Sequence, residues 1–193
     1  MRYDPDYAFF AAWDDPDALR AIVAPGEIIA PVVTSAGPVP QGFTVEREHP
    51  AVQMVAEAVA RATLTDILAL DDSDAPAMRA LAELTEPGPF FARTHQLGRF
   101  VGVRENGVLV AMAGERMRLP GYREVSAVCT HPDHRGRGLA AALTRHVARR
   151  ILDEGEVPFL HAFQSNAGAI ALYQALGFGV RRSLVFTILR RTP

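Results

Sequence analysis

The sequence contains no lysine and only one cysteine, and each shortage excludes a kind of chemistry. Without lysine, the chain cannot form the glycine-rich loop ending in Lys-Ser or Lys-Thr with which P-loop enzymes bind triphosphates. The single Cys129 has no partner for an internal disulfide, which is typical of a protein from a reducing compartment. A signal peptide and an apolar run of about 20 residues are also absent. We therefore expect a cytoplasmic protein without a membrane partner.

The charge balance is close to neutral, with a formal net charge of −2. This value argues against a nucleic-acid partner, which would require a strongly basic surface. Hydrophobic residues make up 49% and charged residues 22% of the 193 positions, so the chain can form one substantial core. We expect residues 1–45 to be an N-terminal extension packed on a single domain, residues 46–193.

The most informative segment is residues 128–140, where an apolar strand leads through a glycine-bearing turn into a helix. A helix N-terminus directs unpaired N–H groups and the positive end of its dipole at one point. Gly136 and Gly138 lack a Cβ atom and let a bulky anion approach the backbone, while Arg135 and Arg137 add positive charge. The segment predicts a phosphate or pyrophosphate site. The third glycine of the dinucleotide-binding fingerprint is missing, which argues against an NAD enzyme.

A second informative segment covers residues 161–178 and follows an apolar run that indicates a strand. Ser165 or Asn166 is a natural N-cap for the helix that follows. Gly177 is suited to end that helix. The residues that recur at helical spacing between them are Ala169, Ile170, Tyr173 and Leu176. Taken alone, this pattern is typical of an ordinary core helix.

Together the two segments resemble the GCN5-related N-acetyltransferase (GNAT) family, and the FR47-like bacterial subgroup in particular. The pyrophosphate signature of that family, Arg/Gln-x-x-Gly-x-Gly/Ala, is matched by Arg135, Gly138 and Ala140. The second family signature is matched by Asn166, Ala169, Ile170, Leu172, Tyr173, Leu176, Gly177 and Phe178. The resemblance covers roughly residues 75–190.

The resemblance implies an α/β (α+β) GNAT fold. Its mixed central sheet has about six to seven strands, helices on both faces and a splay between the two central parallel strands. The acetyl-CoA core would be residues 99–178. A degenerate half of a tandem acetyltransferase is an alternative for residues 1–45.

The sequence pattern also predicts individual elements. Asn106-Gly107 between apolar runs indicates a hairpin over residues 99–118. Further strands are expected at 26–33, 124–130 and 157–162, with a final antiparallel pair after Phe178. Helices are expected at about 51–62, 75–85 and 138–152. A short helix is expected to carry Phe9, Phe10 and Trp13.

The resemblance implies direct transfer of an acetyl group from acetyl-CoA to a primary amine of a small molecule or peptide. The strand backbone at Val128, Cys129 and Thr130 would pair with the pantetheine arm, and Asn166 and Ala169 would also contact the coenzyme. The amides that would hold the pyrophosphate belong to Arg135, Gly136, Arg137, Gly138, Leu139 and Ala140. A sensor that binds acyl-CoA without transfer, and a transferase for another acyl group, are the alternatives.

The catalytic assignments also follow from the resemblance. Tyr173 matches the tyrosine that protonates the departing sulfur, and a phenol with a pKa near 10 can do so without losing its own proton at neutral pH. Glu124 and His161 occupy two positions where family members carry a base, and an ordered water chain is the third option. Cys129 is not expected to be a nucleophile.

The remaining expectations concern the acceptor and other partners. The segment before the hairpin makes Phe90, Phe91, Arg93 and His95 candidate acceptor contacts. No metal site is expected, because His131 and His134 lack a third ligand at a suitable spacing. Dimers are common among relatives, so a homodimer is a further expectation.

Overall fold

The computed structural model describes residues 2–12, 15–34, 37–62 and 66–193. In these residues, nine strands form one mixed sheet in the order β1-β9-β3-β8-β7-β6-β5-β4, and β2 pairs with β9. The strands are β1 (Ile28–Ile29), β2 (Val32–Val33), β3 (Phe43–Val55), β4 (Leu68–Leu70), β5 (Phe100–Glu105), β6 (Val108–Leu119), β7 (Tyr122–Thr130), β8 (Val157–Phe163) and β9 (Gly179–Arg191).

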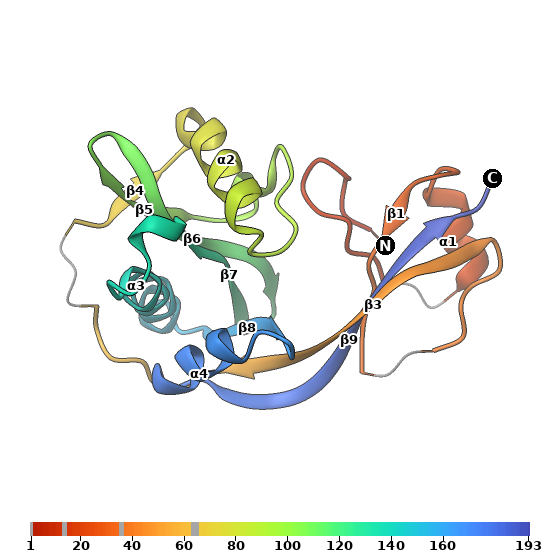
Figure 1. Ribbon diagram of the computed structural model, residues 1–193. Helices are drawn as coiled ribbons and strands as arrows, with labels where there is room; N and C mark the ends of the chain where they lie inside the picture. Colours follow the sequence, from red (N-terminus) through yellow and green to blue (C-terminus); the bar gives the residue numbers. More distant parts are fainter. Residues whose placement is uncertain (1, 13–14, 35–36, 63–65) are drawn as a thin grey trace.

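Four α-helices accompany the sheet in the described part of the chain, and Figure 1 shows α2 on one face and α3 on the other. The residues of β6 alternate between the two layers: Met112 belongs to the buried cluster of Met78 on α2, whereas the next residue, Ala113, belongs to the cluster of Leu143 on α3. Alternate side chains of a strand point to opposite faces, so both faces of the sheet are buried. The helices are α1 (Pro16–Ile22), α2 (Ala75–Thr85), α3 (Leu139–Asp153) and α4 (Ala167–Ala175).

Much of the predicted local structure is confirmed. The β5–β6 hairpin turns at Asn106 and Gly107, whose φ angles of 50° and 81° are those that an Asn-Gly turn requires. The expected strands near 124–130 and 157–162 are β7 and β8, and the helices expected near 75–85 and 138–152 are α2 and α3. These elements have strong caps or clear periodicity, so the sequence locates them well.

The helix predicted for residues 51–62 is wrong. Residues 51–55 are the second half of β3, which lies between β8 and β9. Ala51, Val52 and Met54 are all buried. A central strand covered on both faces loses its alternation of polar and apolar residues, so the valine spacing there resembled that of a helix.

The predicted antiparallel pair after Phe178 is also wrong. Residues 179–191 form the single long strand β9, which pairs with nearly the whole of β3. Its outer edge pairs with β1 and β2, so the N-terminal residues enlarge the sheet to nine strands, rather than six or seven. Figure 1 shows both ends of the chain beside this end of the sheet.

The short helix predicted around Phe9 and Phe10 is wrong as well. The helix begins later, at Pro16, because Asp15 caps it and Pro16 stands at its first position. Phe10 instead forms an isolated bridge with Ala30. Trp13 lies outside the described residues.

The splay between the central parallel strands is confirmed. β7 and β8 pair only from Tyr122 to Glu124 and then separate. A bulge on β7 sets Ala127 and Val128 opposite the single residue Ala113 of β6. Ala127 adopts a positive φ of 51° there. A bulge of this kind bends the strand. Because β8 pairs with β7 only as far as Glu124, the backbone of β7 beyond that residue is left unpaired on its β8 side, in the open part of the splay.

Candidate active site

Two cavities meet in the splay between β7 and β8. The first, called here the loop cleft, has a volume of about 510 Å³ and is lined by the β7–α3 loop and the start of α4. The second, the aromatic cavity, has a volume of about 290 Å³ and is lined from β3, β6, β7, β8 and β9 and from the N-terminal segment. The residues that line both are Glu86, Pro87, Val128, Asn166, Ala169 and Tyr173.

The loop cleft carries the features of an anion site. Gly136 and Gly138 both have a φ of 76°, and a Cβ atom at either position would meet no atom within 4 Å, so the backbone faces open space. Gly138 begins α3 without a side-chain cap, which leaves the first N–H groups of the helix free. Arg135, Leu139 and Ala140 line the cleft as predicted.

Unlike Arg135, Arg137 directs its side chain away from the loop cleft. It pairs with Glu105 at 2.6 Å and does not line the loop cleft. His134 also contacts Glu105, at 3.2 Å. Arg137 can therefore contribute its backbone amide to the loop, while its side chain ties the loop to the end of β5.

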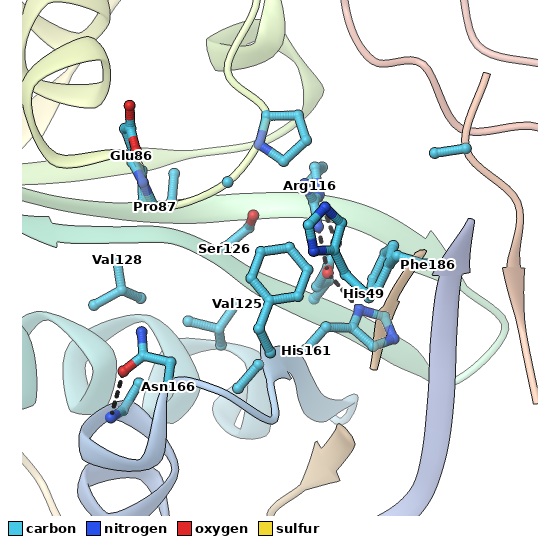
Figure 2. A pocket seen from close by; sticks show the side chains of 18 of the residues that line it. His49, Glu86, Pro87, Arg116, Val125, Ser126, Val128, His161, Asn166 and Phe186 are labelled. Carbon is cyan, nitrogen blue, oxygen red and sulfur yellow. Dashed lines mark hydrogen bonds and ion pairs between the residues drawn. The ribbon is translucent and has the colours of Figure 1, made fainter. Parts of the chain in front are cut away.

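Two polar groups in the cleft suit an amide-bearing ligand. The hydroxyl oxygen of Thr130 is buried with no hydrogen-bond partner among the described residues. The side-chain oxygen of Asn166 accepts a bond from the Ala169 amide at 3.1 Å and so caps α4 (Figure 2). The amide nitrogen of Asn166 keeps both donors for a ligand. The pantetheine arm of coenzyme A carries amides of this kind, so the residues present fit the coenzyme.

Cys129 lines the loop cleft in a buried position. Burial raises the pKa of its thiol to about 11, so the thiolate is scarce at neutral pH. The absence of a nucleophilic role for Cys129 stays a prediction.

Tyr173 stands at the junction of the two cavities. It comes from α4, packs against Phe178 and is 9% exposed. Burial, with a smaller contribution from Cys129, raises the pKa of Tyr173 to about 12. The phenol therefore keeps its proton at neutral pH and can donate a hydrogen bond to a developing anion.

Glu124 is buried at the end of the paired part of β7. Arg116 donates two hydrogen bonds to its carboxylate, at 2.9 and 2.8 Å, and the Met117 amide donates a third. A fourth joins Glu124 to Nδ1 of His161 at 2.8 Å. Burial alone would raise the pKa of Glu124, but the charge and hydrogen bonds of Arg116, with those of His161, lower the pKa to about 2. Glu124 is therefore a fixed anion.

His161 is held on both sides of its ring. Its Nε2 lies 3.2 Å from the amide nitrogen of Gln53, whose oxygen accepts a bond from Arg181. Because the Gln53 amide group is a donor, Nε2 of His161 must accept, and Nδ1 then carries the proton that bonds to Glu124. The structure thus brings two of the predicted catalytic residues together as one hydrogen-bonded pair.

The candidate acceptor contacts from residues 90–95 do not line the aromatic cavity. Phe91 packs on Phe9, Phe90 packs on Phe100, and Arg93 stacks on Tyr7. His95 bonds to Asp72 at 3.0 Å. The side chains that sequence reasoning missed, Phe10, His49, Arg116, Phe163 and Phe186, come from segments far apart in the chain.

Two further observations concern the described residues as a whole. Every helix among them is too short or too polar to cross a bilayer. They contain no group of three or more His, Cys, Asp or Glu side chains placed to bind a metal ion.

A mixed sheet that splays beside an open glycine-bearing loop and a buried tyrosine is the arrangement of the GNAT fold. The FR47-like family model matches residues 100–187. A crystal structure from Novosphingobium aromaticivorans, assigned to the GNAT family of acetyltransferases, is 44% identical, with a TM-score of 0.94 over 100% of this chain and 88% of that one. The chain therefore belongs to the GNAT family, and an acyltransferase enzyme is supported.

More distant structures share the fold. A GCN5-related N-acetyltransferase from Kribbella flavida is 21% identical, with a TM-score of 0.60 over 86% of this chain and 69% of that chain. The ribosomal-protein-S18-alanine N-acetyltransferase from Escherichia coli is 23% identical, with a TM-score of 0.53 over 66% of this chain and 94% of that chain. A search of the curated proteins found no match.

Proposed function

We propose that this protein is an acetyl-CoA-dependent N-acetyltransferase that moves an acetyl group directly to a primary amine of a small molecule or peptide. The observation that carries the proposal is the junction of the two cavities. Tyr173 and Asn166 line both, so a ligand in the loop cleft and one in the aromatic cavity meet beside a buried phenol.

The loop cleft is the side that would hold the coenzyme. Backbone amides from Arg135 to Ala140 would bind its pyrophosphate, as helix N-termini commonly do. Thr130 and the amide nitrogen of Asn166 would bind the arm, together with the backbone of Val128 and Cys129. When bound, acetyl-CoA supplies the acyl group as an activated thioester.

Tyr173 would donate a hydrogen bond to the leaving sulfur atom of the coenzyme. Its phenol holds a proton across the neutral range and stands where the donor and acceptor sides meet. A thiol is a stronger acid than this phenol, so the tyrosine can hydrogen-bond to the developing thiolate and share its proton. The buried Glu124–His161 pair forms part of the acceptor wall.

Calorimetry with acetyl-CoA and a thiol-release assay over a panel of amines test the proposal. We expect binding, and release of coenzyme A that depends on the amine above a no-amine hydrolysis control. Binding without release for any amine would instead favour the acyl-CoA sensor. Faster release from succinyl-CoA or a longer acyl-CoA would favour the transferase for another acyl group.

A further inference from the structure

The aromatic cavity gathers rings from four separate segments. Phe9 and Phe10 come from the N-terminal segment, His49 from β3, Phe163 from β8 and Phe186 from β9. The His49 and Phe163 rings are 5.1 Å apart, Phe163 and Phe186 are 5.9 Å apart, and Phe10 and Phe186 are 6.2 Å apart. Figure 2 shows His49 and Phe186 at one end of the cavity, and Asn166 and Val128 at the other. The far wall of the acceptor side is therefore largely aromatic.

Among the described residues that line this cavity, no arginine is free to bind an anionic ligand. Arg116 is the single arginine among its lining residues. Its guanidinium is bound by the Glu124 carboxylate through two hydrogen bonds, and its face lies 4.6 Å from the centre of the Phe10 ring. A carboxylate or phosphate entering the cavity would lose its hydration without gaining an arginine partner, which is costly.

We infer that the acceptor is a small primary amine with an aromatic or bulky apolar body and no carboxylate or phosphate group, an inference that rests on the proposed function. A volume of about 290 Å³ accommodates one ring and a short alkylamine. The rings also favour the cationic amine, because an ammonium group is attracted to an aromatic face.

Matched acceptors test this inference in the full-length protein. 2-Phenylethylamine and phenylalanine differ only by a carboxylate, and putrescine has two amines but no ring. We expect kcat/KM for 2-phenylethylamine to exceed that for phenylalanine by about 100-fold or more, because the extra carboxylate would be unpaired. Putrescine should also be a poor acceptor. Equal or better use of phenylalanine or putrescine would overturn the inference.

Two variants test whether the aromatic wall of the cavity selects the acceptor. Phe10→Leu should lower kcat/KM for 2-phenylethylamine by about 10-fold and reduce its preference over putrescine. Phe90→Leu is the matched control, since Phe90 packs on Phe100 and does not line the cavity. An unchanged preference in Phe10→Leu would contradict the inference. Failure of every amine to release coenzyme A would instead contradict the proposed function.

A second inference concerns the group that takes the proton from the amine. Both oxygens of Glu124 already accept two hydrogen bonds each, from Arg116, Met117 and His161. A carboxylate has about four acceptor sites, so none remains for an amine or a water molecule. His161 is equally engaged, because Nδ1 binds Glu124 and Nε2 binds Gln53.

His49 lies at the end of the aromatic cavity opposite Asn166 and Val128 (Figure 2). The described residues make no hydrogen bond or ion pair to its ring nitrogens, and its side chain is half-buried. The structure assigns to His49 the role of the base, acting through water because it lies at the end of the cavity opposite Asn166, while Glu124 and His161 are positioning residues. Through that water, one ring nitrogen takes a proton from the ammonium, which frees the nitrogen lone pair for attack, and the imidazolium returns the proton to solvent.

The pH dependence of the reaction tests this role, because a general base must be unprotonated to accept the proton. The other titratable or charged groups that face the cavity are Glu86 beside α2, Arg116 on β6, Glu124 on β7, His161 on β8 and Tyr173 on α4.

His49→Gln should lower kcat/KM at pH 8 by about 100-fold, and the ratio of wild-type to variant kcat/KM should fall as the pH drops to 5. Using the ratio cancels the ionisation of the amine substrate. Added imidazole should restore part of the activity of His49→Gln. His161→Gln is the matched comparison and should keep the wild-type acid limb. A His49→Gln variant with an unchanged rate, or an acid limb lost only in His161→Gln, would overturn the assignment.

Discussion

At the scale of single residues, the site contains two buried acids, Tyr173 and Glu124, whose pKa values are shifted in opposite directions. Tyr173 has no hydrogen bond or cation against its phenol among the described residues, so burial raises its pKa to about 12. Glu124 is more deeply buried, yet Arg116 and His161 hold its pKa near 2. The first group is therefore a proton donor, and the second is a permanent charge that orders its surroundings.

The role of Tyr173 can be tested by removing one atom. Tyr173→Phe should lower kcat by about 100-fold or more while leaving acetyl-CoA affinity nearly unchanged, because the ring still packs but the proton is gone. Steady-state kinetics and calorimetry measure the two quantities. Tyr122→Phe, at an exposed tyrosine on β7, is the control. A Tyr173→Phe enzyme with wild-type kcat would remove Tyr173 from the mechanism.

The lowered pKa of Glu124 makes stability depend on pH. A carboxylate whose pKa is lower in the folded state stabilises the protein above its unfolded pKa of about 4.5. That contribution is lost as the pH falls from about 4.5 to about 2. At pH 7, Glu124→Gln should lower the free energy of unfolding by about 3–5 kcal/mol, since Arg116 is left buried and unpaired.

Urea unfolding at several pH values measures this effect. The difference between wild type and Glu124→Gln should shrink between pH 4.5 and pH 2. Glu83→Gln breaks an exposed pair with Arg79 and should cost at most about 1 kcal/mol. A difference that stays constant with pH would show that the Glu124 carboxylate is not the source of the stability.

At the scale of elements, the β7–α3 loop and the β7 bulge position the site. The loop was predictable, because two glycines and two arginines between an apolar strand and an amphipathic helix form a local pattern typical of an anion-binding turn. The bulge at Ala127 was not, because alanine at a positive φ carries no sequence signal. The second half of β3 was missed for a similar reason: burial on both faces at residues 51–55 removes the periodicity from which a strand is recognised.

Substitutions at two glycines with similar φ angles can distinguish the cost of backbone strain from a loss of coenzyme binding. Gly138 and Gly155 have φ angles of 76° and 79°, and a Cβ atom at either would meet nothing within 4 Å. Gly138→Ala and Gly155→Ala should each lower the free energy of unfolding by about 1–2 kcal/mol. Only Gly138→Ala should weaken acetyl-CoA binding, measured by calorimetry, because Gly155 follows α3 far from the loop. Equal affinities in both variants would contradict the assignment of the loop.

At the scale of the whole molecule, β3 and β9 join the N-terminal segment to the acyltransferase core. Each has 13 residues, and they pair along nearly their whole length. One end of the pair packs with α1 and β1, where Leu19, Ile29 and Leu189 share a buried cluster. The other end joins β8 and the core around Leu143. Figure 1 shows this continuous ribbon.

This continuity predicts a single unfolding transition. Leu19→Ala and Leu143→Ala should each lower the free energy of unfolding by about 2–5 kcal/mol, as both side chains are almost completely buried. Each should shift the same cooperative transition in calorimetry, because strands shared by both clusters couple them. Leu84→Ala, at an exposed position, is the control. Separate transitions that respond to only one substitution would show two independent units.

The sequence by itself determined the family, the glycine-bearing loop and the positions of Asn166 and Tyr173, because these depend on short segments whose spacing is local. It did not reveal the acceptor side. Phe10, His49, Arg116, Phe163 and Phe186 lie up to 176 positions apart and meet only where the N-terminal segment crosses the sheet. The hydrogen bonds that saturate Glu124 and leave His49 free are also long-range contacts. Only the tertiary structure could decide them, since the chemistry of a carboxylate or an imidazole depends on which groups fill its bonding sites.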